Sequence, residues 1–97
     1  MTSPKEMAKQ TAQILIETKS VLFNIDPPYT YTSGRKGPVY TDCRRLISFP
    51  AERTVLMDFA AEMIKSNCKG LDMVAGGETA GIPYAAFVSE RQKLPML

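Results

Sequence analysis

A glycine-rich turn at residues 76–81 carries the strongest chemical signal in this sequence. It reads Gly-Gly-Glu-Thr-Ala-Gly and follows a short apolar stretch, residues 71–75. Helical sequence begins directly after it, near Ile82 and Pro83. Glycine tolerates positive φ and close approach of a ligand, and the first N–H groups of a helix lack partners within it. Strand, glycine turn and helix together are therefore typical of a phosphate or pyrophosphate site.

The turn matches neither of the two common phosphate motifs. It lacks the Lys-Ser/Thr pair of a Walker loop, and its spacing is not Gly-x-Gly-x-x-Gly. A structural interpretation stays open, in which Gly76, Gly77 and Gly81 only allow a tight turn between strand and helix. Glu78 is repulsive beside a pyrophosphate unless it faces away or holds a metal ion through water.

A second candidate region precedes the glycine turn. Residues 29–32 and 39–41 are rich in aromatic and β-branched side chains, and residues 33–38 between them are turn formers. The simplest interpretation is two strands joined by a loop, with Leu46 and Ile47 as an extension of the second strand. Tyr40 and Thr41 then either alternate as one buried and one exposed strand residue or contact a ligand.

Composition limits the classes of function that this chain can have. It has 97 residues, 44% hydrophobic and 23% charged, with a formal net charge of +2. That charge is small and its basic residues are scattered, so we expect no nucleic acid partner. No apolar run approaches the roughly 18 residues that cross a bilayer, and the N-terminus lacks the apolar core of a signal peptide. We expect a cytoplasmic protein without a membrane partner.

Metal chemistry based on histidine and cysteine is excluded within this polypeptide. The chain contains no histidine and only two cysteines, Cys43 and Cys68. Neither a Cys/His zinc site nor a histidine general base can form. We also predict no metal ligand within the chain.

The remaining pattern predicts an α/β fold. Ser3-Pro4-Lys5-Glu6 has the form of a capping box and begins an amphipathic helix over residues 4–20. Apolar residues at helical spacing predict a second helix from about residue 50 to 67. A strand at 71–75, a helix over about 80–91 and the start of a strand at 93–97 form a βαβ unit, which implies a parallel sheet.

Two segments together resemble the orotate phosphoribosyltransferases. Residues 31–44 are similar to that family's early Ser-Gly-x-x-(Ser/Gly)-Pro-x-Tyr-x-Asp-x-Arg stretch, and residues 74–83 are similar to its pyrophosphate loop. The order and separation of the two motifs match as well. The resemblance implies a partial type I phosphoribosyltransferase fold: an N-terminal helix plus β-hood over about 1–47, and the start of the α/β core over 48–97.

The resemblance also implies a reaction and a set of contacts. Orotate and phosphoribosyl pyrophosphate would give orotidine monophosphate and pyrophosphate, with Mg²⁺ carried by phosphoribosyl pyrophosphate and a homodimer as the expected assembly. By motif position, Tyr40 and Thr41 fall where the family contacts the orotate ring. The residues that fall in the pyrophosphate loop, with a cis peptide expected at 78–79, are Gly77, Glu78, Thr79, Ala80 and Gly81.

This chain also departs from the family pattern. Thr32 and Ala80 stand where some members have lysine, so those two contacts do not carry over. The family's catalytic loop and its acidic signature for phosphoribosyl pyrophosphate lie downstream of residue 97. The catalytic residues are therefore unknown from this chain, and we expect the 97 residues alone to be inactive.

Two alternatives stay open at the level of sequence. A purine phosphoribosyltransferase would keep the fold and change the base, but those enzymes lack the Ser-Gly and Tyr-Thr-Asp pattern of residues 33–42. A module of this fold that senses nucleotides or binds a partner, without catalysis, is the other alternative.

Overall fold

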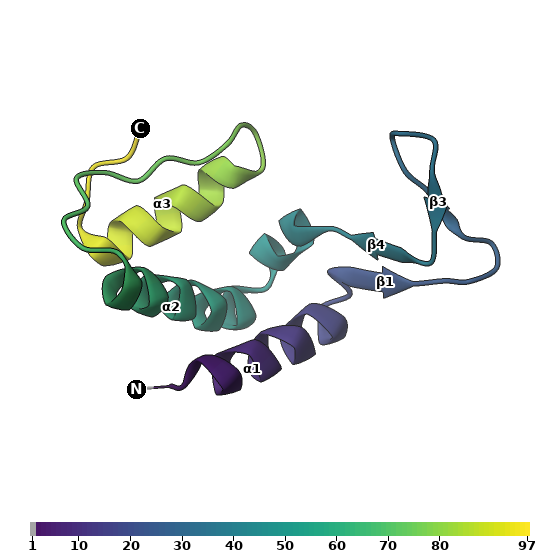
Figure 1. Ribbon diagram of the computed structural model, residues 1–97, viewed down its shortest axis with the longest axis horizontal. Coiled ribbons are helices and arrows are strands. Elements are labelled where there is room, and N and C mark those ends of the chain that lie inside the picture. The colour runs from purple at the N-terminus through teal and green to yellow at the C-terminus, as the bar shows by residue number, and fades with distance from the viewer. Residues whose placement is uncertain (1) are drawn as a thin grey trace. The chain divides into compact units, whose positions relative to one another are not determined.

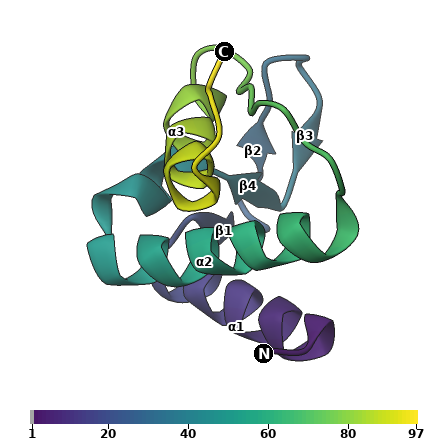
Figure 2. The same cartoon turned by 90° about the vertical axis from the view of Figure 1, so that its left-hand side faces the viewer.

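The computed structural model describes residues 2–97 (Figures 1 and 2). Three α-helices, one 3₁₀-helix and four short strands occur in this range. The chain divides into two compact units, Ser3–Pro50 and Ala51–Leu97, which we call the amino-terminal and carboxyl-terminal units. No helix among residues 2–97 combines the length and the apolarity that a membrane span requires.

The amino-terminal unit begins with α1 (Pro4–Glu17), which starts as the capping box predicts. The backbone N–H of Glu6 donates to the Ser3 hydroxyl at 3.2 Å, and Pro4 occupies the first helical position. The helix ends earlier than the predicted residue 20. Lys19 adopts φ +60°, and the N–H of Ser20 donates to the carbonyl of Leu15 at 2.9 Å. This left-handed residue with its 6→1 hydrogen bond terminates the helix.

Replacing Lys19 by glycine is expected to stabilise the chain. The left-handed conformation costs an L-residue about 1–2 kcal/mol, whereas glycine pays only about 0.5–1 kcal/mol of extra backbone entropy. We expect the free energy of unfolding to rise by about 0.5–1 kcal/mol in urea titrations. Lys9→Gly, in the middle of α1, is the control and is expected to lose about 1 kcal/mol. The reverse ranking would contradict this account of the helix end.

Two antiparallel pairs follow α1, and their pairing differs from the sequence prediction. β1 (Val21–Phe23) pairs with β4 (Val39–Thr41), and β2 (Tyr29–Thr30) pairs with β3 (Lys36–Gly37). The prediction of two strands joined by one plain loop was wrong, because the loop itself contains a strand. Gly34, at φ +89°, turns the chain back early, and the N–H of Tyr31 donates to the carbonyl of Arg35 at 2.8 Å.

A 3₁₀-helix, η1 (Cys43–Ser48), follows β4 where the sequence suggested that the strand continues through Leu46 and Ile47. Leu46 is 3% exposed and belongs to the core. The Arg45 guanidinium donates to the carbonyl of Thr18 at 2.7 Å, which ties η1 to the end of α1. A helical turn lets Leu46 point inward while Arg45 reaches this carbonyl. This explains why these residues form a 3₁₀-helix and not an extended strand.

The carboxyl-terminal unit is built on α2 (Pro50–Asn67) and α3 (Gly81–Gln92). Both fall close to the predicted ranges. Gly70, shortly after the end of α2, adopts φ +66°, which glycine tolerates. Buried side chains lie on both helices, namely Leu56 and Met57 on α2 and Ala85, Val88 and Ser89 on α3.

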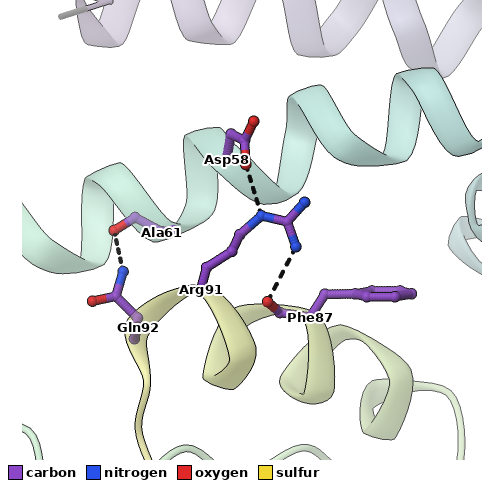
Figure 3. A network of polar contacts seen from close by, with 5 residues as sticks. All are labelled: Asp58, Ala61, Phe87, Arg91 and Gln92. Atoms are coloured by element: carbon purple, nitrogen blue, oxygen red, sulfur yellow. Dashed lines mark hydrogen bonds and ion pairs between the residues drawn. The ribbon is translucent and has the colours of Figure 1, made fainter.

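Polar contacts hold α3 against α2, as Figure 3 shows. Arg91 donates to the Asp58 carboxylate at 2.7 Å, and the Gln92 amide donates to the carbonyl of Ala61 at 2.8 Å. Both contacts join the last turn of α3 to the middle of α2. At the end of α3, a hydrogen bond from Lys93 and then its positive charge lower the pKa of Glu90.

The predicted strands on either side of α3 reduce to a single parallel bridge. Val74 pairs with Met96, through Val74 N–H to Pro95 carbonyl and Leu97 N–H to Val74 carbonyl, both at 2.9 Å. The parallel direction and the crossover through α3 are as the sequence predicts. The predicted lengths of the two strands, 71–75 and 93–97, were wrong. Parallel strands usually pair over their full length when they are buried among neighbours, whereas Met73 and Leu97 are exposed here.

Candidate functional site

The glycine turn lies between the Val74 bridge and the start of α3. Residues 77–80 are exposed, and Gly81 is the first residue of α3. The peptide bond between Glu78 and Thr79 is cis, as the resemblance implies. The structure therefore brings the five predicted loop residues together as one exposed bend on a short connection.

The hydrogen-bond donors of this bend are not the ones that the sequence suggested. The first N–H groups of α3 are already used, because Gly81 donates to the carbonyl of Gly77 at 2.8 Å and Ile82 donates to the carbonyl of Thr79 at 3.3 Å. Pro83, next in the helix, has no N–H. The expectation that the helix N-terminus presents free donors was wrong.

The available donors lie in the loop itself. Within residues 2–97, the backbone N–H groups of Gly77, Glu78, Thr79 and Ala80 donate to no other group. Consecutive exposed amides of this kind form a concave anion site in many proteins. The loop therefore exposes four unbonded backbone donors, and an anion could be bound there without a titrating side chain.

Gly76 has a different role from the one that the sequence suggested. None of Gly76, Gly77 and Gly81 adopts positive φ. A Cβ at position 76 would lie 2.3 Å from the carbonyl oxygen of Gly81 and 2.8 Å from the Cβ of Ala85. Glycine is required there because the incoming chain passes directly against the first turn of α3. A Cβ at Gly77 would meet no atom within 4 Å.

Tyr40 and Thr41 lie on β4, in the amino-terminal unit. Both are exposed, and Tyr40 retains 41% of its surface. The alternative of one buried and one exposed residue was therefore wrong. The ring of Tyr40 lies 5.6 Å from that of Tyr29, centroid to centroid, with 37° between the planes. This tilted packing leaves part of the Tyr40 ring open to solvent beside another aromatic ring.

The sequence analysis did not identify Tyr31. Its hydroxyl donates to the backbone carbonyl of Val39, the residue before Tyr40. The signal that could have found it is the strand expected over residues 29–32, in which Tyr29 and Tyr31, two residues apart, would project to one side.

The described residues do not form a metal site of their own. Among residues 2–97 there is no group of three or more cysteine, aspartate or glutamate side chains placed to bind one ion. Glu78 is the carboxylate of the loop, and one carboxylate is less than the ligand set of a protein-held Mg²⁺. The described residues therefore do not fit a resident metal, and we assign no step through one.

This architecture is the α/β arrangement of the type I phosphoribosyltransferases, present in part. A helix and small antiparallel strands come first, and a parallel bridge, a glycine loop and a crossover helix come second. The described residues thus define a partial α/β fold with an exposed glycine loop at the start of its crossover helix.

The chain is homologous to a part of the orotate phosphoribosyltransferases. That of Ruegeria sp. (strain TM1040) is 52% identical over 96 residues, which cover 97% of this chain and 42% of that protein. That of Rhizobium rhizogenes (strain K84 / ATCC BAA-868) is 53% identical over 93 residues, which cover 94% of this chain and 40% of that protein. The chain spans about two fifths of the length of these relatives. No family model matches the chain.

Solved structures agree with this assignment. Orotate phosphoribosyltransferase from Aeropyrum pernix superposes with a TM-score of 0.73 at 29% identity, over 89% of this chain and 50% of that one. Leishmania donovani UMP synthase superposes with a TM-score of 0.74 at 28% identity, over 90% of this chain and 18% of that one. The resemblance inferred from residues 31–44 and 74–83 is confirmed.

Proposed function

We propose that this chain is part of an orotate phosphoribosyltransferase of pyrimidine synthesis. Such an enzyme transfers the phosphoribosyl group from phosphoribosyl pyrophosphate to orotate and releases orotidine monophosphate and pyrophosphate. The identity of 52% to a protein of that name supports the proposal. Within the chain, the observation that carries it is the run of four exposed, unbonded amides at residues 77–80.

The loop's part in the reaction follows from where charge develops. When the bond between the anomeric carbon and pyrophosphate breaks, negative charge accumulates on the leaving group. Preorganised N–H donors stabilise that charge, and they need no proton transfer to do so. We assign this role to Gly77, Glu78, Thr79, Ala80 and Gly81. The donors among them are the N–H groups of residues 77–80. The N–H of Gly81 already donates to the carbonyl of Gly77, so Gly81 contributes by closing the bend.

We assign the binding of orotate, the base that accepts the phosphoribosyl group, to the amino-terminal unit. Tyr40 and Thr41 are proposed to contact orotate, since an exposed aromatic ring offers a flat apolar surface and a threonine hydroxyl both donates and accepts. The proposal includes Mg²⁺ bound to phosphoribosyl pyrophosphate, where it neutralises phosphate charge. It also includes a homodimer and a cytoplasmic location, as the family resemblance implies.

The test is a titration of the ¹⁵N-labelled chain by NMR. Pyrophosphate with Mg²⁺ is expected to shift the amides of residues 77–80, and orotate is expected to shift Tyr40 and Thr41. Ala80→Asp places a negative charge in the loop and is expected to weaken pyrophosphate binding at least tenfold, or about 1.4 kcal/mol. Ala8→Asp makes the same charge change on exposed α1 and is the control.

The same titration separates the proposal from its alternative. A module that senses nucleotides or binds a partner would respond to orotate while its loop amides ignore pyrophosphate and phosphoribosyl pyrophosphate. Absence of shifts at residues 77–80 with either phosphate would reject the assignment of the loop. Because the chain spans about two fifths of its relatives, we expect chromatography to detect no orotidine monophosphate from the 97 residues alone.

A further inference from the structure

Tyr31 connects the β2–β3 hairpin to the strand that carries Tyr40 and Thr41. It follows β2 directly, and its hydroxyl donates to the carbonyl of Val39 at the start of β4. Its own backbone is fixed by the turn, since its N–H donates to Arg35 and its carbonyl accepts from Gly34 at 2.9 Å. Figure 2 shows this hairpin, with β2 and β3, rising beside β4. The Tyr31 side chain is thus anchored at one end and bonded to β4 at the other.

The sequence makes room for this contact at Gly37. A Cβ built at position 37 would lie 2.5 Å from the Tyr31 hydroxyl and 3.0–3.1 Å from two ring carbons. Real Cβ atoms essentially never approach a heavy atom so closely. The Tyr31 ring therefore lies directly over the glycine, and any side chain at that position would displace the hydroxyl from the Val39 carbonyl.

The bonded carbonyl belongs to the peptide unit that joins Val39 to Tyr40. Its orientation sets the direction in which Tyr40 leaves the backbone, because the peptide unit is planar. β4 is three residues long, and among residues 2–97 its ladder partner is β1, on one side. A short strand held at one edge gains orientation from a further bond, and the N–H of Asn24 to the neighbouring Pro38 carbonyl, at 2.7 Å, adds another.

We propose that Tyr31 is a positioning residue for the base-binding strand, acting through the Val39 carbonyl to set Tyr40 and Thr41. The proposal rests on the proposed function, in which those two residues contact orotate. Tyr31 itself touches no substrate in this account. Removing its hydroxyl leaves the ring in place and releases the peptide unit before Tyr40.

The experiment compares Tyr31→Phe with Thr30→Val in the full 97-residue chain. Both remove one hydroxyl from neighbouring positions, but that of Thr30 has no hydrogen-bond partner within residues 2–97. Orotate affinity is measured by NMR at a temperature where circular dichroism shows every variant folded. Loss of one hydrogen bond corresponds to about fivefold weaker binding for Tyr31→Phe. Thr30→Val is expected to bind as the wild type does.

A readout without ligand tests the positioning separately. The Tyr29 ring, 5.6 Å away, is expected to shift the ring resonances of Tyr40 in the wild type. Tyr31→Phe is expected to move those resonances toward their values in a free peptide, and Thr30→Val is expected to leave them. If Tyr31→Phe does not fold, Gly37→Ala gives the same test, because it retains the hydroxyl and displaces it.

Each outcome decides the proposal. A shift of the Tyr40 resonances with weaker orotate binding in Tyr31→Phe supports it. The proposal is overturned if Tyr31→Phe leaves the Tyr40 resonances unchanged. It is also overturned if Tyr31→Phe binds orotate as tightly as the wild type does and orotate still shifts Tyr40. If the wild type shows no orotate-dependent shift at Tyr40 and Thr41, the assignment of the base site fails, and the resonances without ligand alone decide whether Tyr31 sets the strand.

Discussion

Gly76→Ala is expected to lower the free energy of unfolding by about 3 kcal/mol, at the upper end of the range for overpacked sites. The added Cβ would lie 2.3 Å from the Gly81 carbonyl oxygen and 2.7 Å from its carbon. Both are backbone atoms at the start of α3, so neither can rotate away as a side chain would. The loop or the first turn of the helix must move. Urea unfolding monitored by circular dichroism measures the loss.

Gly77→Ala is the matched control for this prediction. It makes the same chemical change one residue later, where a Cβ meets no atom within 4 Å and φ is not positive. We expect a change of less than about 0.5 kcal/mol, as for other exposed sites. Equal effects of the two substitutions would show that chain stiffness, and not the close approach to α3, explains the glycine at position 76. NMR of the amides of residues 77–80 would locate the rearrangement in Gly76→Ala.

Leu46→Ala is the second substitution with a large expected effect. Leu46 is 3% exposed on η1, so truncation removes buried apolar surface and leaves a cavity. Such changes cost about 2–5 kcal/mol elsewhere, and we expect about 2–4 kcal/mol here, because a small unit can relax around the cavity. The unfolding transition in urea measures it.

Ile16→Ala gives the comparison for Leu46. Ile16 lies on α1 and is 56% exposed, so the same kind of truncation removes little buried surface. Its expected effect is within about 0.5 kcal/mol. If Leu46→Ala were as mild as Ile16→Ala, η1 would not be part of the core, and the extended conformation that the sequence suggested for residues 46–47 would regain support.

Local signals in the sequence located the helices well. The Ser3 cap, the periodic apolar residues of α2 and the glycine turn before α3 each act within a few residues, so they can be recognised without the fold. The end of α1 was missed by three residues, since Leu22 continues the apolar spacing and Lys19 is not a residue that usually takes positive φ. Only the left-handed turn at Lys19 reveals that the helix has already ended.

The strand pairings could not be obtained in the same way. Val21–Phe23 and Val39–Thr41 are separated by an entire hairpin, and short strands carry little register information of their own. The choice among partners depends on which pairing buries apolar side chains while satisfying the backbone, and that is a property of the whole unit. The contact between Tyr31 and Val39 follows from that choice.

Residues adjacent in the chain were enough to predict the α/β class, the position of the glycine loop and the resemblance to orotate phosphoribosyltransferases. The backbone groups that are left without an internal hydrogen bond follow from the tertiary structure. It placed the free donors at Gly77–Ala80 and not at the helix N-terminus, where Gly81 and Ile82 already donate within the bend. Hydrogen bonds and close backbone contacts are settled only when distant atoms meet, and sequence spacing does not record those distances.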